Sequence, residues 1–88
     1  MSMLSKTITE IKIRALMKKR EGAEAALAAM RSAKTSEKRW MEYNERDSHD
    51  INRCMVEFDA NIKHLEAEVT RLTQKEDIEL AEYKEKQD

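Results

Sequence analysis

Residues 51–72 read INRCMVEFDANIKHLEAEVTRL, and their large apolar side chains recur alternately four and three positions apart. This spacing is the a/d pattern of a helix that packs on another helix along one seam. The residues that form it are Ile51, Met55, Phe58, Ile62, Leu65, Val69 and Leu72. The same spacing continues through Glu76 and Glu79 to Tyr83. We therefore expect a helix over about residues 51–85 whose one apolar face meets a partner helix.

The same spacing, extended towards the N-terminus, predicts a first helix over about residues 4–44. Its apolar seam positions are Ile13, Leu16, Ala23, Leu27, Met30 and Met41. Polar residues occupy the seam between these two apolar stretches, namely Lys34, Glu37, Asn44 and Ser48. The seam is thus apolar at both ends and polar in the middle, which favours a turn near the midpoint of the chain.

The polar segment 44–50 lies at that midpoint and is rich in residue types that favour turns and helix N-caps. We expect the turn at about residues 45–50. Asp47, Ser48 or Asp50 would then cap the second helix. A turn at this place folds the chain into two arms of similar length.

The fold class that follows is all-α, a coiled-coil-like antiparallel helical hairpin that forms a single domain over residues 1–88. We expect it to associate further, into a dimer or four-helix bundle. A turn flanked by Ser48 and Ile51 would set Arg20 against Glu79 across the seam, and Leu16 against Tyr83. Two alternatives stay open, namely a turn at residues 32–36 and a single long helix paired with a second copy. Neither candidate turn contains Pro or Gly, the residues that most often interrupt a helix, so the sequence also allows the single long helix.

Charge is divided unevenly between the two halves of the chain. Residues 1–44 carry ten basic and five acidic residues, a net charge of +5, whereas residues 45–88 carry seven basic and thirteen acidic residues, a net charge of −6. Opposite charges favour a chain that folds back on itself or pairs antiparallel with a second copy. The composition agrees, because no Pro, one Gly and 40% charged residues favour long helices over sheet.

Two local signals lie in the first arm. Residues 7–10 read TITE and fit a capping box, in which a Thr hydroxyl and a Glu carboxylate satisfy the exposed amides at a helix start. Gly22 and five nearby alanines form a smooth segment of small residues, which another helix could approach closely. The plainer interpretation of that segment is that Ala fills a helix at little cost.

Several classes of protein are disfavoured by features that the sequence lacks. Cys54 is the one cysteine, so the chain forms no internal disulfide, and this suggests a reducing compartment. No apolar run approaches the roughly 18 residues that cross a bilayer, and the first residues lack the apolar core of a signal peptide. We expect a cytoplasmic protein without membrane contact.

Signatures of catalysis are also weak. His49 has Asp47, Asp50 and Cys54 nearby, but their spacing matches no zinc signature. Gly22 is the sole glycine, so the chain has no glycine-rich phosphate loop. We expect no enzyme activity, no catalytic residues, no bound metal and no cofactor.

A second apolar stripe lies away from the seam. Leu4, Ile8, Ile11 and Ala15 repeat at helical spacing on another face, and Ile78 and Leu80 also leave the seam. In a hairpin the two chain ends lie side by side, so one end of the molecule would carry apolar surface on more than one face. A helix that is apolar on several sides needs more than one neighbour. The predicted partner-binding residues are Leu4, Ile8, Ile11, Ile78 and Leu80, with Trp40 and Tyr43 near the turn as a second site.

The predicted function is a non-catalytic protein–protein interaction module, such as a small chaperone, an adaptor, or a regulator or inhibitor. Its partner would be a second copy of itself, another helical protein, or both. One alternative is a hairpin dimer that binds nucleic acid through a basic cluster, formed by Lys12, Arg14, Lys18, Lys19 and Arg20. Against it stand the pI near 6.1 and the acidic second arm. The other alternative is a structural coiled-coil spacer.

Overall fold

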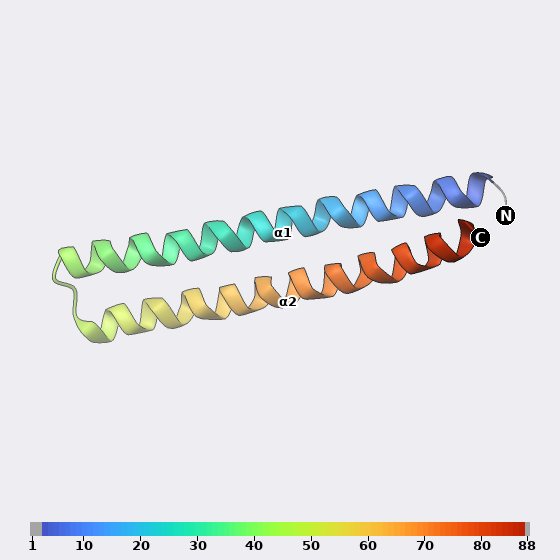
Figure 1. Ribbon diagram of the computed structural model, residues 1–88. Coiled ribbons are helices and arrows are strands. Elements are labelled where there is room, and N and C mark those ends of the chain that lie inside the picture. Colours follow the sequence, from blue (N-terminus) through green and yellow to red (C-terminus); the bar gives the residue numbers. More distant parts are fainter. Residues whose placement is uncertain (1–2, 88) are drawn as a thin grey trace.

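The computed structural model describes residues 3–87, which form two long helices in an antiparallel hairpin (Figure 1). Helix α1 spans Met3–Tyr43 and helix α2 spans Ser48–Gln87. The molecule measures 65 × 14 × 13 Å. The all-α hairpin is confirmed, and both alternatives are wrong, because α1 runs unbroken through residues 32–36 and the chain reverses after Tyr43. The turn is shorter than predicted, and α2 begins at Ser48 instead of about residue 51.

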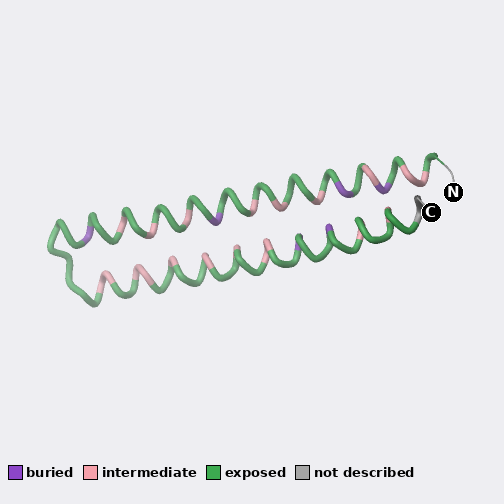
Figure 2. Tube along the Cα trace, viewed as in Figure 1, coloured by how far each residue is buried: buried purple, intermediate pink, exposed green. Residues whose placement is uncertain are grey.

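The seam predicted from the spacing is the interface between the two helices. Figure 2 shows the buried and half-buried residues on the sides where α1 and α2 face each other. The apolar side chains that are buried are those of Ile13, Leu27, Met41 and Leu72. The other apolar seam residues are half-buried, because each helix has a single neighbour and solvent reaches the seam from both flanks. Of the polar seam positions, Asn44 and Ser48 are exposed at the turn.

Two basic seam residues of α1 are matched by acidic residues of α2. The Nε atom of Arg20 donates to Oε2 of Glu76 at 2.5 Å, and Glu76 is one of the best covered residues, at 6% exposed. Lys34 Nζ donates to Oδ1 of Asp59, also at 2.5 Å. A buried carboxylate is tolerated only when a partner of opposite charge compensates its lost hydration, and Arg20 supplies that partner.

The register differs from the predicted one by about one helical turn. Arg20 binds Glu76, not Glu79, and the Tyr83 hydroxyl donates to Oε1 of Glu10 at 2.8 Å, well beyond Leu16 towards the N-terminus. The reason is the position of the turn along the chain. The helices end and begin at Tyr43 and Ser48, so the turn is centred on earlier residues than a turn flanked by Ser48 and Ile51, and each residue of α2 lies about one helical turn further from the turn than predicted.

The turn uses a Schellman motif with no glycine. The amide of Arg46 donates to the Met41 carbonyl at 2.9 Å and the amide of Glu45 to the Glu42 carbonyl at 3.1 Å. These are the two hydrogen bonds that close a helix C-terminus around a left-handed residue. That residue is Glu45, with φ of 54°. The motif satisfies the last carbonyls of α1 and reverses the chain direction.

Asp47 is the N-cap of α2. Its Oδ1 accepts a hydrogen bond from the amide of His49 at 3.1 Å, and its carbonyl accepts from the amide of Ile51 at 3.0 Å. Of the three predicted candidates, Asp47 therefore performs the capping. Asp50 lies in the first turn of α2, where a negative charge interacts favourably with the helix dipole.

The predicted capping box at residues 7–10 is wrong. Helix α1 has already begun at Met3, and the Oγ1 of Thr7 donates to the Met3 carbonyl at 2.9 Å. Thr9 makes the equivalent bond to the Ser5 carbonyl at 3.0 Å. These threonines therefore satisfy carbonyls inside the helix, which is the other common role of Thr hydroxyls in helices.

Candidate interaction surface

At the open end of the hairpin, the beginning of α1 lies beside the end of α2 (Figure 1). This end exposes large apolar side chains. We call this set the open-end surface; it consists of Leu4, Ile8, Ile11, Ile78 and Leu80, which are between 40% and 70% exposed. All were predicted as partner-binding residues, and each lies outside the α1–α2 seam as the spacing indicated.

Polar groups occupy the seam at this same end. Thr9 is only 4% exposed. Tyr83 is half-buried and hydrogen-bonds to Glu10, and the Lys6 ammonium lies 5.8 Å from the centroid of the Tyr83 ring. The usual arrangement of a helix pair is therefore reversed here, with polar contacts inside and branched aliphatic side chains outside. The hairpin by itself gives those aliphatic side chains no partner helix.

The structure brings only part of the predicted surface together. Ile78 lines a shallow groove of about 430 Å³ on one flank, beside Ala15 and Leu16 of α1. Two lysines, Lys12 and Lys75, edge the same groove. Leu80 follows Ile78 by two residues, which is about 200° around the helix, and so lies on the other flank. The apolar surface therefore extends around the open end instead of forming one compact patch.

The second predicted site lies at the opposite end of the molecule. Trp40 is 51% exposed and Tyr43 is 87% exposed. Trp40 also helps to close the turn, because the Arg46 guanidinium lies 5.4 Å from its ring centroid and Asn44 Nδ2 donates to its carbonyl at 2.8 Å. Tyr43 projects into solvent. Within one copy, these aromatic residues are separated from the open-end surface by most of the length of the hairpin.

Three further exposed apolar side chains lie outside the set of predicted partner-binding residues, those of Met3, Met17 and Val56; the sequence singled out the two methionines only as adaptable side chains that suit contact surfaces. Met17 could have been found, because the heptad frame that defines the seam places it just beside the seam on α1. Val56 follows the seam residue Met55 directly, and its exposure follows from the same frame. Met3 begins α1.

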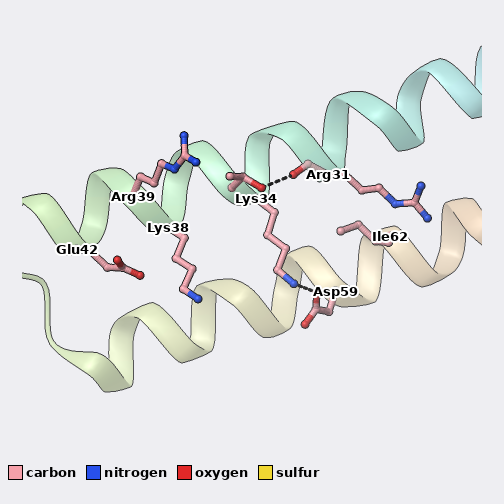
Figure 3. Close-up of a pocket in the computed structure, with 8 residues that line it drawn as sticks. Arg31, Lys34, Lys38, Arg39, Glu42, Asp59 and Ile62 are labelled. Atoms are coloured by element: carbon pink, nitrogen blue, oxygen red, sulfur yellow. Dashed lines mark hydrogen bonds and ion pairs between the residues drawn. The ribbon is translucent and has the colours of Figure 1, made fainter.

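A second groove, of about 630 Å³, lies nearer the tip and has a basic lining (Figure 3). Figure 3 shows Lys34 and Lys38 extending from α1 towards α2, whereas Arg39 points away. Acidic residues offset this positive charge. Lys34 is bound to Asp59, Glu42 lies in the same lining, and Arg31 reaches Glu66 at 3.8 Å.

Four of the five residues of the predicted nucleic-acid cluster are exposed, and the fifth is half-buried. Lys12, Arg14, Lys18 and Lys19 are exposed on α1. Arg20 is half-buried and bound, to Glu76 across the seam and to Glu24 at 3.0 Å on its own helix. The hydrogen bond to Glu76, followed by that to Glu24, raises the pKa of the Arg20 guanidinium. Arg20 thus serves the seam, and the outward-facing cluster is reduced to its other members.

Across the described part of the chain, no group of three or more His, Cys, Asp or Glu side chains is arranged to hold a metal ion. Neither of the two described helices combines the length and the apolar character that crossing a membrane requires. No family model, no curated protein and no solved structure matches this chain.

Proposed function

We propose that this protein is a non-catalytic interaction module that contributes its two helices to a larger helical assembly, in the manner of an adaptor, small chaperone or inhibitor. The observation that carries the proposal is the open-end surface, where large aliphatic side chains face solvent while polar groups occupy the seam. A soluble helix pair would gain stability from the reverse arrangement. The observed arrangement, with aliphatic side chains outside, becomes favourable when further helices cover the outer face.

The energetic argument rests on burial. Covering one Leu or Ile side chain is worth about 1.5–3 kcal/mol. Residues such as Leu4 and Ile11, at 70% and 60% exposed, retain most of that free energy for a partner. The hairpin itself has a small core, because few apolar side chains, such as that of Leu72, are buried and the other apolar seam residues are half-buried. Association would therefore supply a large share of the total apolar burial.

The first prediction concerns Ile8 and Ile11. The double change Ile8→Ser with Ile11→Ser removes two aliphatic groups that the assembly would bury, so we expect association to weaken by at least about 100-fold. Sedimentation equilibrium measures self-association, and affinity capture with the chain as bait measures retention of other helical proteins. Circular dichroism checks that helicity survives.

The matched control is Arg14→Ser with Glu21→Ser, two exposed α1 positions outside the open-end surface. This control changes the same number of residues to the same type and leaves net charge unaltered, so assembly should persist. If the Ile8 and Ile11 variant assembles as well as wild type, or if wild type neither self-associates nor retains any protein, the interaction function is wrong and the spacer alternative gains support.

A further inference from the structure

One heptad row of α1 carries no charge along its length, although exposed basic residues such as Lys12 and Arg39 lie in the rows beside it. Taking every seventh residue from Ile8 gives a set that we call the outer row, consisting of Ile8, Ala15, Gly22, Ala29, Ser36 and Tyr43. All of these residues are exposed. In a chain that is 40% charged, the seam of α1 contains Arg20, Lys34 and Glu37, whereas the outer row contains no charged residue. Seven residues are close to two helical turns, so the outer row follows one side of the helix.

Side-chain size along the outer row is symmetric about its centre. The large residues Ile8 and Tyr43 stand at its two ends, and small residues fill the positions between them. The neighbouring large residues Ile11 and Trp40 stand at corresponding distances from the same centre, which lies between residues 25 and 26. An interface between two identical copies related by a two-fold axis must be self-complementary in this way.

We propose that the outer row is covered by a second copy of this chain, with the two α1 helices antiparallel and a two-fold axis between residues 25 and 26. Ile8 then faces the second copy's Tyr43, Ile11 faces its Trp40, and Gly22 faces its Ala29. This inference rests on the proposed function and names the partner. The two predicted contact sites, at opposite ends of one hairpin, become a single contact between two hairpins.

Gly22 gains a role in this pair. A glycine inside a helix costs about 1 kcal/mol relative to alanine. Nothing in the hairpin explains the cost, because a Cβ built at Gly22 meets no atom within 4 Å. In the proposed pair Gly22 lies close to the two-fold axis, where a missing Cβ lets the two helices approach closely.

The area of the face is sufficient for a specific dimer. The outer row spans about 52 Å at 1.5 Å per residue, and a helix is about 12 Å wide with its side chains. One copy therefore presents on the order of 600 Å² and the pair about 1,200 Å², which is at the lower end of specific interfaces.

The corresponding face of α2 is a poor alternative to that of α1. The positions of α2 equivalent to the outer row are Asp50, Glu57, His64, Arg71, Ile78 and Glu85. Burying these ionisable groups would cost free energy unless each were paired. The outer row of α1, which has no ionisable group of this kind, is therefore the row that a second copy fits better.

The charges of the two α1 helices predict how self-association depends on ionic strength. Two α1 helices bring two regions of net charge +5 together and place Lys12 near the second copy's Arg39. Dissolved salt screens that repulsion, so self-association should strengthen as ionic strength rises. Packing of α1 on the acidic α2 of another copy would show the opposite dependence.

The test compares two identical substitutions by sedimentation equilibrium over a wide concentration range. Ala29→Leu places a bulky side chain against the second copy's Gly22 and should weaken dimerisation by at least about tenfold. Ala67→Leu makes the same change at an exposed position of α2 and should leave the dimer intact. Both variants should remain helical, because Leu is a good helix former. Equal dimerisation of the two variants would overturn the proposed interface.

A cross-linking experiment fixes the register. In a Cys54→Ser background, chains carrying Ala15→Cys are mixed with chains carrying Ser36→Cys under a mild oxidant. The two positions face each other, so the mixture should form a disulfide-linked heterodimer, and neither chain alone should cross-link efficiently. Efficient cross-linking within either single variant, or none in the mixture, contradicts this register. If wild type is monomeric yet retains a helical protein that the Ile8 and Ile11 variant loses, the second copy is the wrong partner and the proposed function stands.

Discussion

Glu45 adopts a backbone conformation that L-residues usually avoid. Its φ of 54° places it in the left-handed region, and it is the one non-glycine residue with positive φ in the part of the chain that the structure describes. Glycine normally occupies this position of a Schellman motif, because a Cβ there crowds the following carbonyl. The turn is held in spite of this cost by its two backbone hydrogen bonds and by Arg46 against the Trp40 ring.

Replacing this residue should therefore stabilise the hairpin. We expect Glu45→Gly to raise the free energy of unfolding by about 1 kcal/mol, since glycine adopts the left-handed conformation without a steric penalty. Urea denaturation followed by circular dichroism measures the change. Glu21→Gly, at an exposed interior position of α1, is the control and should lower stability by about 1 kcal/mol. A lower midpoint for Glu45→Gly than for wild type would contradict this account of the turn.

At the scale of the helices, the charged pair in the seam selects the register. Apolar residues at a and d positions allow registers that differ by one turn with similar burial. Arg20 and Glu76 allow only the observed register, because sliding α2 by one turn would leave a nearly buried carboxylate without its guanidinium. The pair thus contributes specificity more than net stability, as buried ion pairs often cost as much in desolvation as they gain.

Substitutions at this pair test its role. Arg20→Met removes the partner of Glu76 and should lower the free energy of unfolding, because the carboxylate is left without a compensating charge. The double variant Arg20→Met with Glu76→Met leaves no carboxylate to compensate and should recover most of that loss. A double-mutant cycle from urea denaturation at neutral pH measures the coupling. Additive effects of the two single changes would mean that the pair is not coupled.

The limits of prediction from sequence lie at these same elements. The seam was predictable because buried apolar residues such as Leu27 and Leu72 repeat with the helical period. The turn chemistry was not, since Glu45 replaces the glycine that usually marks such a turn. The register depended on where the turn is centred, so the predicted contact of Arg20 with Glu79 was off by one turn. The open-end surface was predictable, because residues such as Ile8 and Ile78 fall outside the heptad seam.

For the whole molecule, folding lays a basic helix against an acidic one. Among the described residues, three ion pairs cross between the helices, joining Arg20 to Glu76, Arg31 to Glu66 and Lys34 to Asp59. The opposite net charges of the two halves of the chain lie within about one Debye length of each other at moderate salt. The basic residues of α1 therefore produce a weak field at a distance, which disfavours binding to nucleic acid.

We accordingly expect no measurable RNA or DNA affinity at about 50 mM salt, where phosphate contacts would be strong. Fluorescence anisotropy with labelled single-stranded and double-stranded oligonucleotides measures it. The opposite result would be an affinity that falls steeply with salt and disappears in Lys18→Gln with Lys19→Gln, but not in Lys63→Gln with Lys84→Gln on α2. Arg20 is left unchanged in this experiment because its loss would disturb the seam.

The 65 Å length of the hairpin also governs how its mass must be determined. Its radius of gyration is 19.6 Å. A compact chain of the same length would have about 12 Å, and a compact protein needs about 300 residues to reach the observed value. On a gel-filtration column calibrated with globular standards, one 10.3 kDa hairpin therefore elutes early, as an apparent oligomer. Elution volume would report the shape of this protein, whereas sedimentation equilibrium reports its stoichiometry.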